Sequence, residues 1–141
     1  MFFGYYEHNL DNKGRIVIPS KMREEAGQVI YIMKGYDGAL SVFKKEDFER
    51  FLLESQSIAF NKKNSRAYLR AQFASASELE VDKQGRVQIP TTLLAKYNIG
   101  KELVILGVGD HIEIWDKQAY LTYEADVNEN FEDIAENLEK E

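Results

Sequence analysis

The chain has 141 residues, an apolar fraction of 44% and a formal net charge of −6. This length suits one domain or two small fused units, and the apolar content predicts a folded core. The absence of cysteine excludes disulfides and thiol chemistry, and no apolar run is long enough to span a membrane. The first residues lack the features of a signal peptide, so we expect a cytoplasmic protein.

Residues 6–10 alternate as in a strand, and residues 12–14 have the length of a hairpin loop whose last position, Gly14, favours positive φ. Residues 15–18 form the returning strand, which ends at Pro19 because proline cannot donate to a ladder. The remaining elements of this half are expected in this order: a short helix over 21–26, strands over 29–34 and 39–43, and an amphipathic helix over 46–56.

A basic helix over residues 61–74 is predicted to link the two halves, with Ala67, Tyr68 and Phe73 facing inward. The second half then repeats the plan of the first. Its expected elements are strands over 78–81, 86–89, 102–106 and 111–115, and helices over 92–97 and from Lys117 onward.

Negative charge is concentrated near the C-terminus. Residues 124–141 contain eight acidic residues and one base and carry −7, whereas the rest of the chain has 17 bases and 16 acids. Because residues 1–123 are close to neutral overall, they can bind phosphates only through local clusters of positive charge. Residues 128–140 predict an acidic helix with an apolar stripe that could dock on the body or on a neighbouring subunit, or shield a basic surface. The stripe consists of Phe131, Ile134, Ala135 and Leu138.

A short motif occurs twice. Residues 11–15 read D-N-K-G-R, and residues 82–86, 71 positions later, read D-K-Q-G-R; each is followed by a short apolar segment and a proline. The similarity extends over about 5–54 and 76–125 and indicates one structural unit used twice. We therefore predict an α+β fold in which two β-hairpin/helix units pack about a pseudo-twofold axis around one shared core. Both charged turns are expected to point the same way.

The chain resembles the MraZ family of bacterial transcriptional regulators over nearly its whole length. The resemblance is carried by residues 3–8 (F-G-Y-Y-E-H), the two D-x-x-G-R turns, the following I-x-I-P and residues 112–115 (I-E-I-W). It implies a single MraZ-like domain over residues 1–141, built as an AbrB-like swapped-hairpin barrel with peripheral helices. It also implies a nucleoid-associated, sequence-specific regulator of the division and cell-wall gene cluster. Such a regulator forms ring-shaped homo-oligomers and binds short direct repeats of double-stranded DNA in its own promoter.

The resemblance assigns DNA contact to a D-x-x-x-R signature in each turn. The chemistry suits DNA, because a two-stranded ribbon fits the major groove and an arginine fork matches the two acceptors of guanine. Lysines near the tips would contact phosphate. The predicted DNA-binding residues are Asp11, Asn12, Lys13, Gly14, Arg15, Asp82, Lys83, Gln84, Gly85 and Arg86.

The two aspartates need a separate explanation, because phosphate repels a carboxylate. Each can accept hydrogen bonds from the N–H groups of its own turn and orient the arginine across the loop. We favour these roles over a contact with cytosine N4. The sequence leaves open which arginine reads bases and which contacts phosphate.

Several alternatives remain at this stage. About four engaged cations would give a salt slope of only about −3.6, so oligomerisation is expected to supplement the affinity. A ring-forming scaffold that binds a protein through the same turns is the competing hypothesis. Arg66 and Arg70 could hold phosphates, or could lie on a solvated face or pair with another subunit. No enzyme, cofactor, metal or small-molecule substrate is predicted, because no nucleophile motif or phosphate loop is present and His8 and His111 lack ligand spacing.

Overall fold

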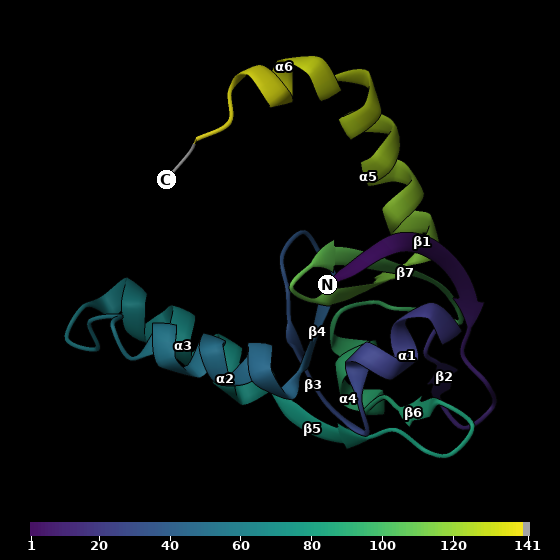
Figure 1. Ribbon diagram of the computed structural model, residues 1–141. Helices are drawn as coiled ribbons and strands as arrows, with labels where there is room; N and C mark the ends of the chain where they lie inside the picture. The colour runs from purple at the N-terminus through teal and green to yellow at the C-terminus, as the bar shows by residue number, and fades with distance from the viewer. Residues whose placement is uncertain (140–141) are drawn as a thin grey trace.

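The computed structural model describes residues 1–139 as a six-stranded sheet, a two-stranded ribbon and a set of helices (Figure 1). The strands are β1 (Phe2–Asn9), β2 (Arg15–Val17), β3 (Val29–Lys34), β4 (Leu40–Lys44), β5 (Ser77–Glu80), β6 (Arg86–Gln88), β7 (Glu102–Gly109) and β8 (Ile112–Asp116). The helices are α1 (Ser20–Ala26), α2 (Lys45–Ser55), α3 (Lys63–Ser75), α4 (Thr91–Lys96), α5 (Lys117–Glu129) and α6 (Phe131–Glu136). None of these helices is long and apolar enough to cross a lipid bilayer.

The large sheet has the strand order β1-β7-β8-β4-β3-β5, and its neighbouring strands are antiparallel. Strands β1, β3 and β4 of the first repeat correspond to β5, β7 and β8 of the second. If each strand is replaced by its counterpart, the strand order becomes β5-β3-β4-β8-β7-β1, which is the original order reversed. A pseudo-twofold axis requires this relation. The axis passes through the pair Ser41 and Glu113, where β4 meets β8. The α+β prediction with two repeated units is confirmed.

Hairpin strands are exchanged between the repeats. β1 pairs with β7 and β5 pairs with β3, while β2 and β6 pair with each other. Within each charged turn one bond still has the form of a local hairpin, from Asp11 N to Arg15 O and from Asp82 N to Arg86 O, both at 2.9 Å. The expected pairing of residues 6–10 with 15–18 is therefore wrong beyond the turn, whereas the swapped arrangement agrees with the AbrB-like resemblance. The exchange lets the short β2 complete its hydrogen bonds with an equally short strand.

The ribbon of β2 and β6 lies over one face of the sheet. Its central pair, Ile16 and Val87, is only 3% and 2% exposed and belongs to the main core with Ile32 and Ile105 of the sheet. Burial of one such side chain contributes about 1.5–3 kcal/mol, so this pair fixes the ribbon to the sheet. On the opposite face, Trp115 packs beneath α5 in a smaller cluster.

Helices α2 and α3 lie side by side and project from the sheet as an arm (Figure 1). Among the residues predicted to face inward on α3, Ala67 and Phe73 are exposed; Gln72 and Ser75 are buried instead. The reason is that the C-terminal end of α3 meets the sheet, where Ser75 Oγ accepts a hydrogen bond from Lys34 N at 2.8 Å. Apolar side chains on the arm remain exposed: Leu53, Phe60 and Phe73.

The acidic helix predicted over 128–140 is interrupted. α5 ends at Glu129 and α6 starts at Phe131, because Asn130 leaves the helical conformation with φ −109° and ψ 14°. The apolar residues that were expected to dock are 60% exposed at Phe131 and 44% exposed at Ile134. The stripe therefore does not dock on the body. Position 140 lies outside the described residues.

Gly107 provides a test of the sheet. It pairs with Gly4 of β1, and a Cβ added to Gly107 would lie 2.2 Å from the backbone nitrogen of Phe3. Gly107→Ala should push β1 away from β7 and lower the free energy of unfolding by about 1–3 kcal/mol, measured by urea denaturation. The neighbouring exposed change Val108→Ala should cost less than about 0.5 kcal/mol. Equal stability of the two variants would contradict the close strand pairing.

Candidate nucleic-acid interface

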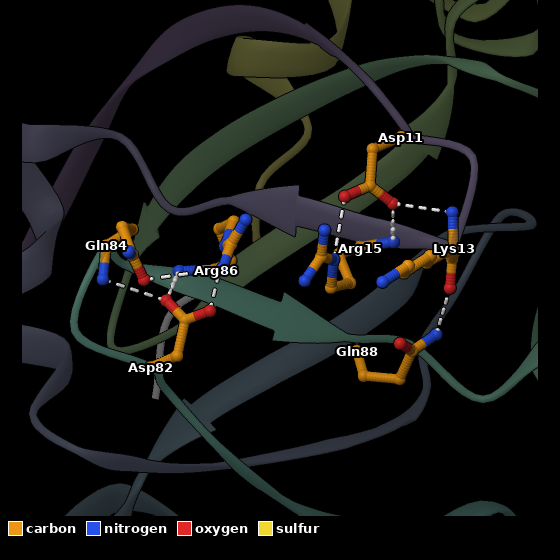
Figure 2. Close-up of polar contacts among 7 residues, drawn as sticks. All are labelled: Asp11, Lys13, Arg15, Asp82, Gln84, Arg86 and Gln88. Atoms are coloured by element: carbon orange, nitrogen blue, oxygen red, sulfur yellow. Dashed lines mark hydrogen bonds and ion pairs between the residues drawn. The ribbon is translucent and has the colours of Figure 1, made fainter.

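The carboxylate of Asp11 organises the first turn (Figure 2). Its Oδ1 accepts hydrogen bonds from the backbone N–H groups of Lys13 at 2.8 Å and Arg15 at 2.9 Å, and its Oδ2 accepts one from Arg15 Nε at 2.7 Å. Gly14 N donates to Asp11 O at 3.0 Å, with φ 75° at Gly14. One carboxylate thus holds both the loop and the arginine, which confirms the two roles predicted for the aspartate within the turn.

The second turn repeats these bonds. Asp82 Oδ1 accepts from the N–H groups of Gln84 at 2.9 Å and Arg86 at 2.8 Å, and Oδ2 accepts from Arg86 Nε at 2.8 Å. The side chains of the aspartates are 37% and 38% exposed in the first and second turn, and those of the arginines 26% and 32%. The two turns are close copies, and each leaves its arginine side chain partly accessible to solvent.

These hydrogen bonds stabilise the ionised form of both aspartates. The backbone N–H of Arg15, helped by its guanidinium and the N–H of Lys13, lowers the pKa of Asp11 to about 2. The backbone N–H of Arg86, with its guanidinium, likewise lowers the pKa of Asp82. Both carboxylates are therefore charged at neutral pH. Each turn combines one negative charge with two positive charges, from its lysine and its arginine.

The two arginines share the outer face of the ribbon. Arg15 stands opposite Gln88, and Val17 stands opposite Arg86. Opposite residues of an antiparallel pair point to the same side, and positions two apart on a strand share that side. Because the central pair between them points into the core, this face of the ribbon points to solvent.

The turns themselves lie at opposite ends of the ribbon (Figure 2). This arrangement follows because β2 and β6 are antiparallel and each turn precedes its strand. The prediction that both turns point the same way is therefore wrong for the tips. The strands have only three residues each, so Arg15 and Arg86 are diagonal neighbours, with Cα atoms roughly 8 Å apart by strand geometry.

Two contacts distinguish the ends of the ribbon (Figure 2). Gln88 Nε2 donates to the carbonyl oxygen of Lys13 and ties the first turn to the opposite strand; Val17, its counterpart, has no group that could do so. In the second turn, Gln84 Oε1 accepts from Arg86 Nη2 at 3.3 Å. Val17 and Gln88 were missed as site residues, although their spacing two positions after each arginine places them on the same face.

A third arginine lies beneath the second turn. Arg23 of α1 donates from Nη2 to the carbonyl oxygen of Ile18 at 3.1 Å, and its guanidinium is so near Gly85 that a Cβ there would lie 2.2 Å from Nε. Its Nε is buried without a hydrogen-bond partner among the described residues. The equivalent position beneath the first turn is Leu94. The second turn therefore rests on a positive group that the first turn lacks.

The basic residues of the linking helix lie elsewhere. Arg66 Nη1 donates to the carbonyl oxygen of Phe60 at 3.3 Å, and the guanidinium of Arg70 lies 5.7 Å from the centre of the Phe60 ring. Their helix extends away from the ribbon (Figure 1). These contacts favour a structural role on the arm over phosphate binding. Residues 1–139 hold no group of three or more side chains that could bind a metal ion.

The topology and the two matching turns define a swapped-hairpin protein with an arginine-bearing ribbon on its surface. The family model described as "MraZ protein, putative antitoxin-like" matches the chain twice, over residues 1–71 and 72–141. The two matches cover the whole chain, so the chain belongs to the MraZ family.

Individual relatives agree with this assignment. The chain is 40% identical over 139 residues to the transcriptional regulator MraZ of Lactobacillus helveticus, covering 99% of this chain and 97% of the relative. It is 41% identical to the protein of the same name from Mesoplasma florum, covering 98% and 95%, and 41% identical to that of Acetivibrio thermocellus, covering 98% and 96%. These relatives are named as regulators and not as enzymes, in agreement with the expectation that the chain is not an enzyme.

One solved structure is distantly similar. The solution structure of PHS018 from Pyrococcus horikoshii aligns with 77% of this chain and 92% of its own, with a TM-score of 0.36 and 18% identity. This likeness is too weak to bear on fold or function.

The lowered pKa of Asp11 can be measured directly. A carboxyl whose pKa is depressed in the folded chain stabilises the fold above its ordinary pKa of 3.8, and this contribution is lost as the pH falls toward about 2. Carbon-13 NMR should find the Asp11 midpoint near 2. In Arg15→Ala most of the depression should persist, because its largest cause is the backbone N–H of residue 15. A return to 3.8 in that variant would show that the guanidinium dominates instead.

Proposed function

We propose that this protein is a sequence-specific, DNA-binding transcriptional regulator that acts in the cytoplasm at the nucleoid. It recognises short direct repeats in the promoter of its own operon, within the division and cell-wall gene cluster, through its two D-x-x-x-R turns. The observation that carries the proposal is the exposed face of the β2–β6 ribbon, on which Arg15 and Arg86 are each held by an aspartate. The names of the relatives support the same function.

The dimensions of the ribbon suit the major groove, which admits a two-stranded β-ribbon. A separation of roughly 8 Å between the two arginine Cα atoms corresponds to about two base-pair steps of 3.4 Å. Each guanidinium uses Nε to bind its aspartate, so that carboxylate does not engage its terminal nitrogens, although Nη2 of Arg86 also donates to Gln84 Oε1 at 3.3 Å. These terminal nitrogens can form the bidentate contact with guanine that arginine favours. Lys13 and Lys83, exposed at the two tips, suit phosphate.

Self-association completes the proposal. Two turns with a net charge of about +1 each offer few phosphate contacts, and binding through so few would be weak at physiological salt. A ring that presents several ribbons to consecutive repeats raises the effective concentration of each. The exposed apolar residues of the α2–α3 arm, Leu53, Phe60 and Phe73, are suited to contact a second copy of the chain.

Removal of either arginine should abolish specific binding. Arg15→Ala and Arg86→Ala each delete a group that can contribute about 1–3 kcal/mol of base discrimination, so affinity for the promoter should fall by about 5- to 150-fold. Footprinting on the DNA upstream of this gene, with each variant, measures this. Lys117→Ala, at the start of α5 on the face of the sheet opposite the ribbon, also removes one positive charge and serves as the control. Unchanged promoter affinity in both ribbon variants would remove the assigned roles.

Affinity should rise steeply with the number of repeats in the target. Duplexes that carry one to four copies, compared by fluorescence anisotropy at fixed salt, should show gains of about 10²-fold or more once two subunits bind together. Scrambled spacers of equal length control for duplex length. A flat response across the series would contradict the multivalent arrangement.

The scaffold alternative, in which the same charged turns bind a protein, draws on the exposed apolar residues of the arm, which would build a ring in either case. The double variant Arg15→Ala with Arg86→Ala separates the two functions, because it leaves the arm unchanged. If this variant assembles normally, measured by light scattering, and loses promoter binding, the turns serve DNA. If promoter binding persists while a protein partner is lost, the scaffold function is correct.

A further inference from the structure

The outer face of the ribbon is nearly twofold symmetric. A dimeric or pseudo-dimeric surface with full twofold symmetry matches a palindromic site, because each half meets the same sequence. It would also bind an asymmetric site equally well in either direction. Any residue that breaks the symmetry on this face therefore gives the ribbon a direction along the duplex.

We propose, on the basis of the DNA-binding function above, that residues which differ between the two repeats on this face set the direction in which the protein reads its site. Three pairs of equivalent positions differ there. They are Asn12 and Lys83, Lys13 and Gln84, and Val17 and Gln88.

The Val17 and Gln88 pair distinguishes the two ends of the face chemically. Gln88 stands opposite Arg15, and its amide donates to the backbone of the first turn, so this amide positions Lys13 and is largely occupied. Val17 stands opposite Arg86 and is 37% exposed. An aliphatic group beside an arginine offers apolar contact to a thymine methyl. The Arg86 end therefore favours a different base step from the Arg15 end.

The two lysines place the same charge at different positions in the two turns. Lys13 is the third residue of its turn and Lys83 is the second of its own. Their ammonium groups therefore approach the phosphate backbone at different offsets from the arginines. In place of the third-position lysine, the second turn has Gln84, which binds Arg86 Nη2 and restrains its guanidinium. Arg23 also differs between the repeats, but it lies beneath the turn and bonds to Ile18, away from the outer face.

Two opposite sets of substitutions can make the face symmetric. The first set, Val17→Gln, Lys83→Asn and Gln84→Lys, converts the second half to match the first. The second set converts the first half to match the second, and it consists of Asn12→Lys, Lys13→Gln and Gln88→Val. Each set moves one lysine without changing the net charge, so the salt dependence should keep its slope. If one triple variant does not fold, the other still tests the proposal.

Selection of bound sequences from a random duplex library is the decisive experiment. The wild-type protein should enrich an asymmetric motif, and both symmetric variants should enrich inverted repeats. An inverted repeat selected by the wild-type protein, or an asymmetric motif retained by the folded variants, would overturn the proposal while the DNA-binding function stands. Failure of the wild-type protein to enrich any sequence would instead remove the function itself.

Affinity cleavage gives the direction directly. The chain has no cysteine, so Ser20→Cys or Thr91→Cys provides a unique attachment point for an iron chelate. These two exposed positions are equivalent in the repeats and begin α1 and α4. On the duplex selected by the wild-type ribbon, each label should cut one end by about 10-fold or more over the other. With either symmetric set of substitutions added, the two ends should be cut within about twofold. Equal cutting by the labelled wild-type ribbon would contradict the proposal.

Discussion

The pairing of β2 with β6 is the interaction on which the rest of the structure depends. Each strand has only three residues and could not form a stable hairpin by itself. By pairing across the repeats, the two strands bury Ile16 and Val87 in the shared core. The same pairing brings Arg15 and Arg86 onto one outward face. The contact that closes the core thus also builds the candidate binding surface.

Within that surface, the single carboxylate of each aspartate holds both the backbone of the turn and the arginine side chain. A carboxylate at the first position of the turn reaches two backbone N–H groups with one oxygen and the arginine Nε with the other. This arrangement fixes the guanidinium before any ligand arrives, which lowers the entropy lost on binding. It also limits the charge of the surface. The resulting face is locally positive on a chain whose net charge is −6, so binding depends on geometry and on the number of ribbons more than on long-range attraction.

Features that depend on local sequence could be predicted, and those that depend on register could not. The repeated D-x-x-G-R motif specifies both turns. Its aspartate accepts hydrogen bonds from the backbone N–H groups of the turn and its glycine adopts positive φ, and neither role needs distant residues. The roles of Gln88 and Arg23 could not be predicted, since each acts on the opposite repeat and becomes visible only in the swapped pairing. The helix periodicity of α3 predicted the wrong inward residues, because the arm leaves the sheet and most of its length has no core to face.

The positions of the arm and the ribbon explain how one small chain can carry both proposed interactions. The α2–α3 arm projects from one side of the sheet and the β2–β6 ribbon lies on another (Figure 1). Copies that associate through the exposed apolar residues of the arm would therefore leave the arginines accessible. Contacts between copies would rest on apolar burial, which is insensitive to salt, and contacts with phosphate would weaken as salt rises. An assembly of this kind would keep its number of subunits while its affinity for DNA changes with the salt concentration.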